Sequence, residues 1–551
     1  MLFGLAALGS LAAFLGNIYV VKSVDLFGSP LLFAVSLLVE VIIIIIFAYC
    51  LLRTLRLPLK IIASILGSAW QGALDNSYVT HWRQHHPKIS HWLGDRLSAK
   101  DPYGLVLTLG VTTVLLLFSQ FINILVNVLH HGSLTQIDVR IIHLMPSLRT
   151  PLQTNFFRFV TFTNNSQSVL LLTTLTTGIL WRRRQWFAAL SVISVLISSQ
   201  LINFIAKNLV GRMRPERLLS VYTENSYSFP SGHTMQATAL SGFLAYLLFR
   251  SFTSVVARIM IILGYIGTVV LVGLSRVYLG VHYPSDVLAA VFLGAALLAG
   301  VITVIEITVR YSLLKQTDCS FSNRRLAVVP VLVVLFSIAF NSYFVPVTSH
   351  HSIHKTIDIG AVNETTIHRL PLYSETLTGK TMEPINFIYL GSKPQLERVF
   401  LVHGWYEADH STVANTLKAF AVGYQNMQYL QAPVTPSYLD TYPEDLAFEQ
   451  PTQLNTLRQR HHTRLWRTNY TSAGREVWVA TASYDEGIEL SGAAKIPTHH
   501  IDPNIDNERN YIARSLSLKD TSYLQVVGPQ AGRNAGGDGF FTDGRAILTM
   551  L

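Results

Sequence analysis

Three short clusters of residues have side chains suited to binding an anion and moving protons. Lys207, Arg214 and Arg276 place three cations at the ends of apolar segments. A single cation at such a place commonly only anchors a helix at the membrane interface. Three on one face predict an anion site, because arginine presents a planar fork of donors and lysine a compact charge. The clusters read KNLVGRMRP (207–215), FPSGH (229–233) and SRVYLGVHYPSD (275–286).

The FPSGH cluster stands directly before an apolar segment that is long enough for a helix. The first N–H groups of a helix have no partner inside it, and with the helix dipole they favour a bound anion. Gly232 would let the backbone approach an oxyanion, and the Ser231 hydroxyl could donate a hydrogen bond or cap the helix. A capped turn alone would explain Pro-Ser-Gly, but it would not explain His233 at the mouth of the helix.

The third cluster places His282 four residues before Asp286, and Pro284 between them predicts the start of a helix. Asp286 could merely favour the helix N-terminus electrostatically, or it could reach back to one ring nitrogen of His282. Beside Arg276 we favour the second interpretation, which leaves the other nitrogen free as a nucleophile. His233 could then give a proton to a leaving oxygen. No His, Asp or Glu cluster beside these residues has metal-ligand spacing, so we predict neither a metal nor another cofactor.

The elements that would position these clusters are membrane-spanning helices. Half of the 551 residues are hydrophobic, only 13% are charged, and the mean hydropathy is +0.36, whereas a soluble chain carries about 25% charged residues. About 20 mostly apolar residues cross a bilayer, and on that criterion the sequence predicts nine spans. They lie near 2–21, 29–52, 104–129, 166–181, 185–206, 234–250, 257–278, 286–309 and 326–344.

Basic residues predict how these spans are oriented. The connections 53–103, 182–184, 250–258 and 310–325 are basic and fall on one side, which the positive-inside rule assigns to the cytoplasm. All three clusters and everything after residue 345 would then face outside. The outside loop 207–217 is itself basic, and this exception to the rule calls for a functional reason.

The composition changes after Phe344, where a soluble α+β domain is predicted. Residues 346–551 carry 17 Lys or Arg and 21 Asp or Glu, so the chain's net charge of +10 arises from the membrane part. Residues 411–424 have the apolar spacing of a helix, and the glycine-rich stretch Gly528–Gly544 could be disordered. No Arg/Lys stripe with interleaved aromatics indicates nucleic-acid binding. Runs typical of short strands are Ile385–Leu390, Val399–Val402 and Val477–Thr481.

The three clusters together resemble the signature of the type 2 phosphatidic acid phosphatase (PAP2) superfamily. That signature is K-x6-R-P, then P-S-G-H, then S-R-x5-H-x3-D, and every fixed position is present over roughly 104–310. The resemblance implies a six-helix bundle and metal-independent removal of a phosphate from a membrane lipid. It implies that His282 is the nucleophile, that Asp286 orients it and that His233 is the general acid. By the same resemblance the phosphoryl group would be held by Lys207, Arg214, Ser231, Gly232 and Arg276.

The region after residue 345 resembles the LssY-type C-terminal domain, which occurs fused behind PAP2 units in bacterial membrane proteins. The stretches that carry the resemblance are HGWYEADHST (403–412), RHHTRLWR (460–467) and HHIDPNIDNER (499–509). The resemblance implies no established chemistry. Six of their residues could form a metal or phosphate site, or they could equally be a solvated polar surface, which we favour. These residues are His461, His462, His499, His500, Asp502 and Asp506.

The predicted fold is therefore an all-α polytopic membrane domain followed by a soluble α+β domain. We expect N-terminal spans and a basic connection in 1–103, the phosphatase domain in 104–310, a loop and last span in 311–345, and the soluble domain in 346–551. The predicted substrate is a lipid phosphate of the phosphatidate or undecaprenyl diphosphate type, in a bacterial inner membrane with the site facing the periplasm. Two alternatives stay open: phosphoryl transfer between lipids, and an anchored envelope-binding or assembly module whose outer domain, with an unknown protein partner, carries the main role.

Overall fold

The computed structural model describes residues 61–98, 103–310, 323–344 and 356–551, apart from short gaps within them. Contacts divide the chain into a helical unit, formed before residue 131 and in 150–348, and a C-terminal unit, formed by 131–149 and 349–551. The predicted spans near 2–21 and 29–52 lie outside the described residues, and so does most of 411–424. The gaps are 62–63, 66–67, 70, 73–74, 217–218, 223, 411–414, 416–417, 420–421, 423–424, 426, 453–458, 492–495 and 535–536.

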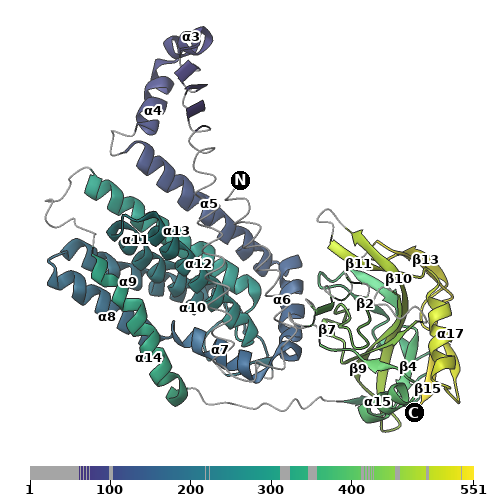
Figure 1. Ribbon diagram of the computed structural model, residues 1–551. Helices are drawn as coiled ribbons and strands as arrows, with labels where there is room; N and C mark the ends of the chain where they lie inside the picture. Colours follow the sequence, from purple (N-terminus) through teal and green to yellow (C-terminus); the bar gives the residue numbers. More distant parts are fainter. Residues whose placement is uncertain are drawn as a thin grey trace. The chain divides into compact units, whose positions relative to one another are not determined.

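Among the residues that the structure describes, four helices of the helical unit are long and apolar enough to cross a membrane, namely α5, α9, α12 and α13. Figure 1 shows α9, α12 and α13 packed in one bundle, with α10 and α11 between them. The bounds are α3 Ser77–His85, α4 Pro87–Leu97, α5 Leu105–Leu129, α7 Pro151–Phe162, α8 Ser166–Arg182, α9 Trp186–Val210, α10 Gly232–Gln236, η4 Ala237–Ser241, α11 Gly242–Ser251, α12 Val255–Tyr278, α13 Pro284–Arg310, η5 Arg324–Ala327 and α14 Val328–Phe344.

The ends of these helices follow from single residues. Helix α9 ends at Gly211, whose φ of 62° is left-handed and therefore suits glycine. Helix α13 begins at Pro284, where a proline costs no hydrogen bond because the first N–H groups have no helical partner. Between α10 and α11 the chain makes a π-helical turn, η4, a feature that often marks a functional site. The end of α9 and the start of α13 therefore meet the loops that carry the first and the third cluster.

The core of the helical unit lies between α8, α9, η4, α11 and α13. Val192, Val195, Phe243 and Leu247 are almost fully buried in it. Large apolar side chains on the outer faces of α5, α9 and α12, such as Leu115, Ile197 and Val270, are exposed. Apolar surface of this kind is stable against lipid and unfavourable against water, so the exposed stripe agrees with a bundle immersed in a bilayer.

The C-terminal unit is built on a nine-stranded sheet with the strand order β12-β15-β4-β10-β9-β8-β5, where β1 pairs with β9 and β11 with β10. A four-stranded sheet, β3-β2-β6-β7, and the hairpin β13-β14 accompany it. The strands are β1 Ile357–Asp358, β2 Tyr373–Glu375, β3 Thr381–Pro384, β4 Phe387–Leu390, β5 Tyr406–Glu407, β6 Tyr438–Leu439, β7 Tyr442–Pro443, β8 Leu446–Pro451, β9 Arg460–Ser472, β10 Arg475–Ser491, β11 Ile496–Ile501, β12 Ser522–Gln525, β13 Gln530–Arg533, β14 Gly539–Thr542 and β15 Arg545–Met550.

Two apolar clusters lie on opposite faces of the large sheet, because side chains alternate along a strand. One face carries Leu465 and Trp478, which pack against Phe400 of α15 (Lys393–Val402) and Ile512 of α17 (Ile505–Ser515). The other face carries Trp466 and Val479 in a second cluster with η6 (Ile367–Arg369). The sheet is thus buried on both faces. Buried polar side chains lie in β8, β9 and β10, and they include Glu449, Arg460, His462 and Asp485.

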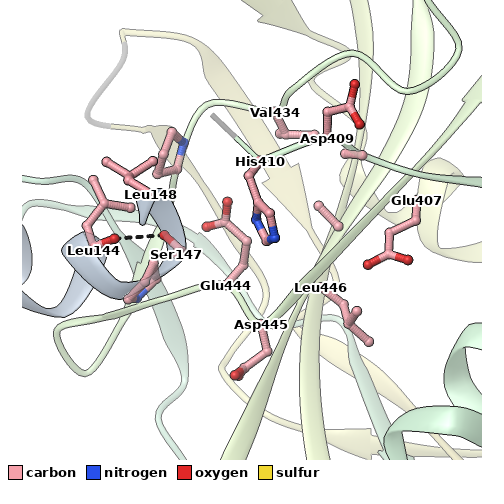
Figure 2. A pocket seen from close by; sticks show the side chains of 14 residues that line it. Leu144, Ser147, Leu148, Glu407, Asp409, His410, Val434, Glu444, Asp445 and Leu446 are labelled. Carbon is pink, nitrogen blue, oxygen red and sulfur yellow. Dashed lines mark hydrogen bonds between the residues drawn. The ribbon is translucent and has the colours of Figure 1, made fainter. Parts of the chain in front are cut away.

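The segment 131–149 folds as part of the C-terminal unit, although the chain places it between α5 and α7. It forms α6 (Ser133–Leu144) and η2 (Met145–Leu148). The His143 ring stacks on Tyr442 with 3.9 Å between ring centroids. Figure 2 shows Leu144, Ser147 and Leu148 of this segment beside Glu444 and His410, around a cavity of about 50 Å³.

Two local predictions in the C-terminal part were wrong. Val399–Val402, predicted as a strand, is the last turn of α15, which starts with a capping box between Ser392 and Gln395. The capping box marks the start of a helix. A run of only four apolar residues does not by itself distinguish a helix from a strand, so the capping box is the stronger signal. Gly528–Gly544, predicted to be disordered, contains the paired strands β13 and β14, whereas Ile385–Leu390 and Val477–Thr481 do contain strand β4 and part of β10.

Candidate active site

The three sequence clusters meet at a cavity of about 160 Å³ in the helical unit. Helix α9 brings Lys207, the loop after it brings Arg214, the start of α10 brings Gly232 and His233, and the loop before α13 brings His282. The cavity is also lined by Asn164, Ser166, Val169, Gln200, Glu224, Ser226 and Gln236. Residues up to 118 positions apart in the sequence, Asn164 and His282, therefore share one small polar space.

Asp286 lies on the Nδ1 side of His282, as the spacing in the sequence predicts. The distance from His282 Nδ1 to Asp286 Oδ2 is 3.5 Å, and both side chains are buried. The Asp286 carboxylate accepts hydrogen bonds from the Tyr283 backbone at 2.9 Å and from Ser228 Oγ, which itself lies 3.4 Å from His282 Nδ1. Arg212 adds an ion pair to Asp286 at 2.6 Å, so the carboxylate is held from three directions.

The contact between Arg214 and His282 identifies the proton-bearing nitrogen of the ring. Arg214 Nη1 lies 3.1 Å from His282 Nε2. Because a guanidinium can only donate hydrogen bonds, Nε2 must present its lone pair, which leaves the proton on Nδ1 toward Asp286. Burial, followed by the charges of Arg214 and Arg276, lowers the pKa of His282 well below its usual value. The ring is therefore neutral, with Nε2 beside the cations of the cavity.

The three predicted cations do not have equal access to the cavity. Lys207 and Arg214 line it, and Lys207 Nζ donates to the Tyr227 carbonyl. Arg276 is fully buried behind it, where it donates to Thr161 Oγ1 at 2.7 Å and to the Tyr222 hydroxyl. The structure thus brings Lys207 and Arg214 to the cavity wall and places Arg276 one layer further back.

The FPSGH cluster forms the start of α10 as predicted, with Gly232 and His233 on the cavity wall. Ser231 is the residue that caps the helix in sequence, but its side chain makes no capping hydrogen bond. Its buried hydroxyl instead accepts from Thr234 Oγ1 at 3.0 Å. Ser231 therefore lies beside the cavity without lining it.

The sequence analysis missed three residues of this site, namely Glu224, Arg212 and Ser228. Glu224 Oε2 lies 2.6 Å from Arg214 Nη2, and Glu224 Oε1 pairs with Arg276. Although burial alone would raise the pKa of Glu224, the charges of Arg276, His233 and Arg214 lower it overall. The only signal in the sequence was an acidic residue in the loop 211–231, whose first part is basic. Arg212 and Ser228, both in contact with Asp286, lie in that same loop.

The histidines of the C-terminal unit do not gather in one site. Through Nδ1, His461 contacts Glu508 at 2.8 Å, His462 lies 3.4 Å from Asp485, and His500 contacts Asp538 at 2.7 Å. Asp502 accepts from the Asn504 backbone, and Asp506 pairs with Arg509; His499 lies in β11, and its side-chain environment is not described. Within the described ranges, no three His, Cys, Asp or Glu side chains are grouped as metal ligands. A shared metal site, one of the two open interpretations, is not formed by the described residues.

Comparison with known proteins supports the same division of the chain. The PAP2 superfamily matches residues 188–310, and the LssY C-terminus matches residues 367–546. Phosphatidylglycerophosphatase B of Bacillus subtilis (strain 168) is 33% identical over 181 residues, which are 87% of that enzyme and 32% of this chain. The chain belongs to the PAP2 superfamily. The predicted resemblances to PAP2 proteins and to the LssY C-terminal domain are confirmed.

Other PAP2 relatives have different lipid substrates in their names. Decaprenylphosphoryl-5-phosphoribose phosphatase of Mycobacterium tuberculosis (strain CDC 1551 / Oshkosh) is 36% identical over 21% of this chain and 58% of its own length. Lipid A 1-phosphatase of Rhizobium johnstonii (strain DSM 114642 / LMG 32736 / 3841) is 31% identical over 20% of this chain and 44% of its own. A crystal structure of a transmembrane PAP2 type phosphatidylglycerolphosphate phosphatase from Bacillus subtilis covers 35% of this chain and 96% of its own at 29% identity, with a TM-score of 0.33. PAP2 enzymes are metal-independent phosphatases, and these relatives all act on lipid-linked phosphates.

Proposed function

We propose that this PAP2 protein is a multi-pass membrane phosphatase that hydrolyses a phosphate monoester or diphosphate of a lipid through a phosphohistidine. The observation that carries the proposal is the placement of His282, whose Nε2 lone pair faces Arg214 while its Nδ1 faces Asp286. A neutral imidazole held in one tautomer beside cations suits attack on phosphorus. The family relationship supports the same chemistry, since the relatives named above are lipid phosphatases.

The first chemical step forms an Nε2–P bond and breaks the bond between phosphorus and the lipid oxygen. Arg214 would exchange its contact with Nε2 for a phosphoryl oxygen, and Lys207 would contact a second one. Arg276 would add its charge from behind, and the first N–H groups of α10, at Gly232 and His233, would stabilise the same oxygens as charge develops. Burial and the charge of Arg276 lower the pKa of His233 to about 3, so the proton that it gives to the leaving lipid oxygen would enter the site with the anionic substrate.

The second step breaks the Nε2–P bond again. Water attacks phosphorus, the now neutral His233 takes one proton from the water, and inorganic phosphate leaves with His282 restored. Asp286 keeps the His282 proton on Nδ1 throughout, so that Nε2 is the nitrogen that gains and loses phosphorus. Neither step uses a metal ion. We further propose that the cavity faces the periplasm of a bacterial inner membrane, because the basic connections predict the opposite side as cytoplasmic.

The test measures phosphate release by the full chain, purified in detergent micelles with EDTA present. Phosphatidate, phosphatidylglycerol phosphate and undecaprenyl diphosphate are offered separately, with wild type and His282→Ala in parallel. We expect turnover of at least one lipid, unaffected by EDTA and reduced about 10³-fold or more in the variant. Rapid acid-free quenching of a turnover with ³²P-labelled lipid should trap label on the wild-type chain but not on the variant.

The matched control is His130→Ala, which removes an exposed histidine at the end of α5, away from the cavity lining. It should keep wild-type turnover. Retention of most activity in a folded His282→Ala protein would refute the phosphohistidine mechanism. Label that appears on a second added lipid instead of in water would show phosphoryl transfer in place of hydrolysis.

A further inference from the structure

A second cavity, of about 600 Å³, lies in the C-terminal unit around His461. Its walls come from the end of β8, from β9 and β10, and from one side of α17. A volume of this size falls within the roughly 300–1,000 Å³ of small-molecule sites in proteins. The described residues that line it are Pro451, Thr452, Gln459, His461, Tyr484, Asp502, Asn507, Glu508, Tyr511 and Arg514.

The centre of this cavity is a histidine fixed by a buried carboxylate. Both oxygens of Glu508 lie within hydrogen-bond distance of His461 Nδ1, at 2.8 and 3.0 Å, and only 4% of Glu508 is exposed. The His461 ring also stacks on Tyr511, with 3.9 Å between centroids and 12° between planes, and lies 4.9 Å from the Tyr484 ring. Ring orientation and tautomer are thus set by three neighbours.

This arrangement leaves His461 Nε2 as an acceptor. An ionised Glu508 can only accept from the ring, which places a proton on Nδ1, and an imidazole with its one proton there presents a lone pair at Nε2. Among the described residues, Nε2 has no hydrogen-bond partner. The guanidinium of Arg514 and the side-chain amide of Asn507, both exposed, likewise have no partner among the described residues. The cavity therefore offers one fixed acceptor and several unused donors.

The charges of the wall exclude most kinds of ligand. Two carboxylates, Asp502 and Glu508, face one guanidinium, Arg514, so a phosphate would meet more repulsion than attraction. A metal ion lacks its ligand set, since the described part of the chain contains no group of three metal-ligating side chains. An apolar ligand would leave Nε2 and the amides without partners at a cost in free energy. A neutral ligand with several hydroxyl groups satisfies these donors and acceptors.

We propose that this cavity binds a sugar, with one hydroxyl donating to His461 Nε2. Arg514 and Asn507 would donate to other sugar oxygens, and the face of Tyr484 would pack against ring C–H groups, as aromatic side chains do in polar sites. The site is separate from the phosphatase cavity in residues and in chemistry. Its presence gives the LssY-type domain a binding role that does not depend on the proposed phosphatase activity.

The test is saturation-transfer difference NMR on the full chain in lipid nanodiscs, because sugar-based detergents would compete. The probes are glucose, galactose, N-acetylglucosamine, cellobiose and chitobiose, each alone and then with excess inorganic phosphate. At least one sugar should receive saturation from the wild-type protein, and phosphate should not displace it. A sugar that phosphate displaces would place the binding in an anion site and overturn the proposal.

Two variants locate the binding. His461→Ala should abolish the transfer, and Arg514→Ala should weaken it at least threefold while the fold stays intact, because Arg514 is exposed and unpaired. The matched control is His500→Ala, which removes a histidine held by Asp538 in the same manner but outside the cavity lining. No transfer from any of the five sugars, or transfer that is equal in wild type and Arg514→Ala, would overturn the proposal.

Discussion

Two of the cavities described here are built on the same pair of side chains, a histidine whose Nδ1 faces a buried carboxylate. They differ in the residues that surround this pair. In the helical unit Arg212 pairs with Asp286, and Arg214 contacts His282 Nε2. In the C-terminal unit His461 lies between the rings of Tyr511 and Tyr484. A shared pair of residues is therefore no evidence for a shared reaction, because the neighbours decide which ligand is tolerated.

One glutamate in the lining of each cavity, Glu224 in the first and Glu508 in the second, shows the effect of these neighbours. Glu224 and Glu508 are both largely removed from water, and burial by itself raises the pKa of each. For Glu224 the charges of Arg276, His233 and Arg214 reverse that effect and lower the pKa, whereas for Glu508 the contact with His461 does not reverse it. The arginines around the first cavity thus outweigh burial at Glu224, whereas burial prevails at Glu508.

The largest expected effect comes from removing the carboxylate charge behind the catalytic histidine. Asp286→Asn keeps the size of the side chain but can offer an N–H to His282 Nδ1, which would favour the wrong tautomer. We expect phosphate release to fall about 10²–10⁴-fold, the range for lost acid–base positioning, mainly in kcat. Steady-state phosphate release from the lipid that the wild type prefers measures it.

The control for this comparison is Asp538→Asn in the C-terminal unit. Asp538 contacts His500 Nδ1 at 2.7 Å but lines neither the phosphatase cavity nor the cavity around His461. Its change should leave phosphate release at the wild-type rate. An Asp286→Asn protein that keeps more than a tenth of wild-type kcat would mean that Ser228 and Arg214 suffice to orient His282.

The contrast between the two sites also explains what could be predicted from the sequence. His282 and Asp286 are four residues apart at the start of one helix, so local geometry alone brings them together. His461 and Glu508 are 47 residues apart, and only the order of β9, β10 and α17 makes them neighbours. The sequence showed the stretches that contain both residues, but no pattern in it joins one to the other.

The fold shows the same contrast between local features, which the sequence predicts, and long-range pairings, which it does not. The spans described here were predicted because twenty apolar residues in a row are a local signal, and α5, α9, α12 and α13 are long apolar helices. Strand order in the C-terminal sheet depends on pairings such as that of β15 with β4, which are about 160 residues apart in the chain. Glu224 was missed for a related reason: its loop gave no periodic signal, and its partner Arg276 lies 52 residues further on.

A smaller effect is expected from Glu224, which pairs with two of the arginines expected to act on the substrate phosphate. Its carboxylate lies on the cavity wall, so a phosphoryl group must compete with it for Arg214. Glu224→Gln removes this competing anion while keeping a similar shape. We expect inhibition by vanadate, a phosphate analogue, to tighten about tenfold, which corresponds to about 1.4 kcal/mol.

The opposite result would assign Glu224 another role. If its charge serves to hold Arg276 and Arg214 in place, Glu224→Gln should weaken vanadate inhibition and lower kcat together. Glu216, an exposed acid in the same loop, provides the matched control: Glu216→Gln changes the loop charge equally and should leave vanadate inhibition unchanged. Equal shifts in the two variants would indicate a general effect of loop charge.

The last effect leaves activity unchanged and concerns only the stability of the C-terminal unit, where a buried acid tests the claim that burial prevails. Burial raises the pKa of Glu444 to about 7, even though Arg464 acts in the opposite direction. Glu444 Oε2 accepts from the Ser437 backbone at 2.9 Å and lies in the cavity of Figure 2.

A carboxyl whose pKa is higher in the folded than in the unfolded chain stabilises the fold fully below its unfolded pKa. It loses that contribution as pH rises through the folded pKa. The C-terminal unit should therefore lose about 3 kcal/mol between about pH 4.5 and about pH 7. Glu444→Gln, which resembles the protonated acid and can still accept from Ser437, should remove that slope. Thermal unfolding of both proteins across this range measures the difference, in which groups common to both cancel. Parallel slopes would mean that Glu444 is ionised when folded, and that the C-terminal unit stabilises buried negative charge as the phosphatase cavity does.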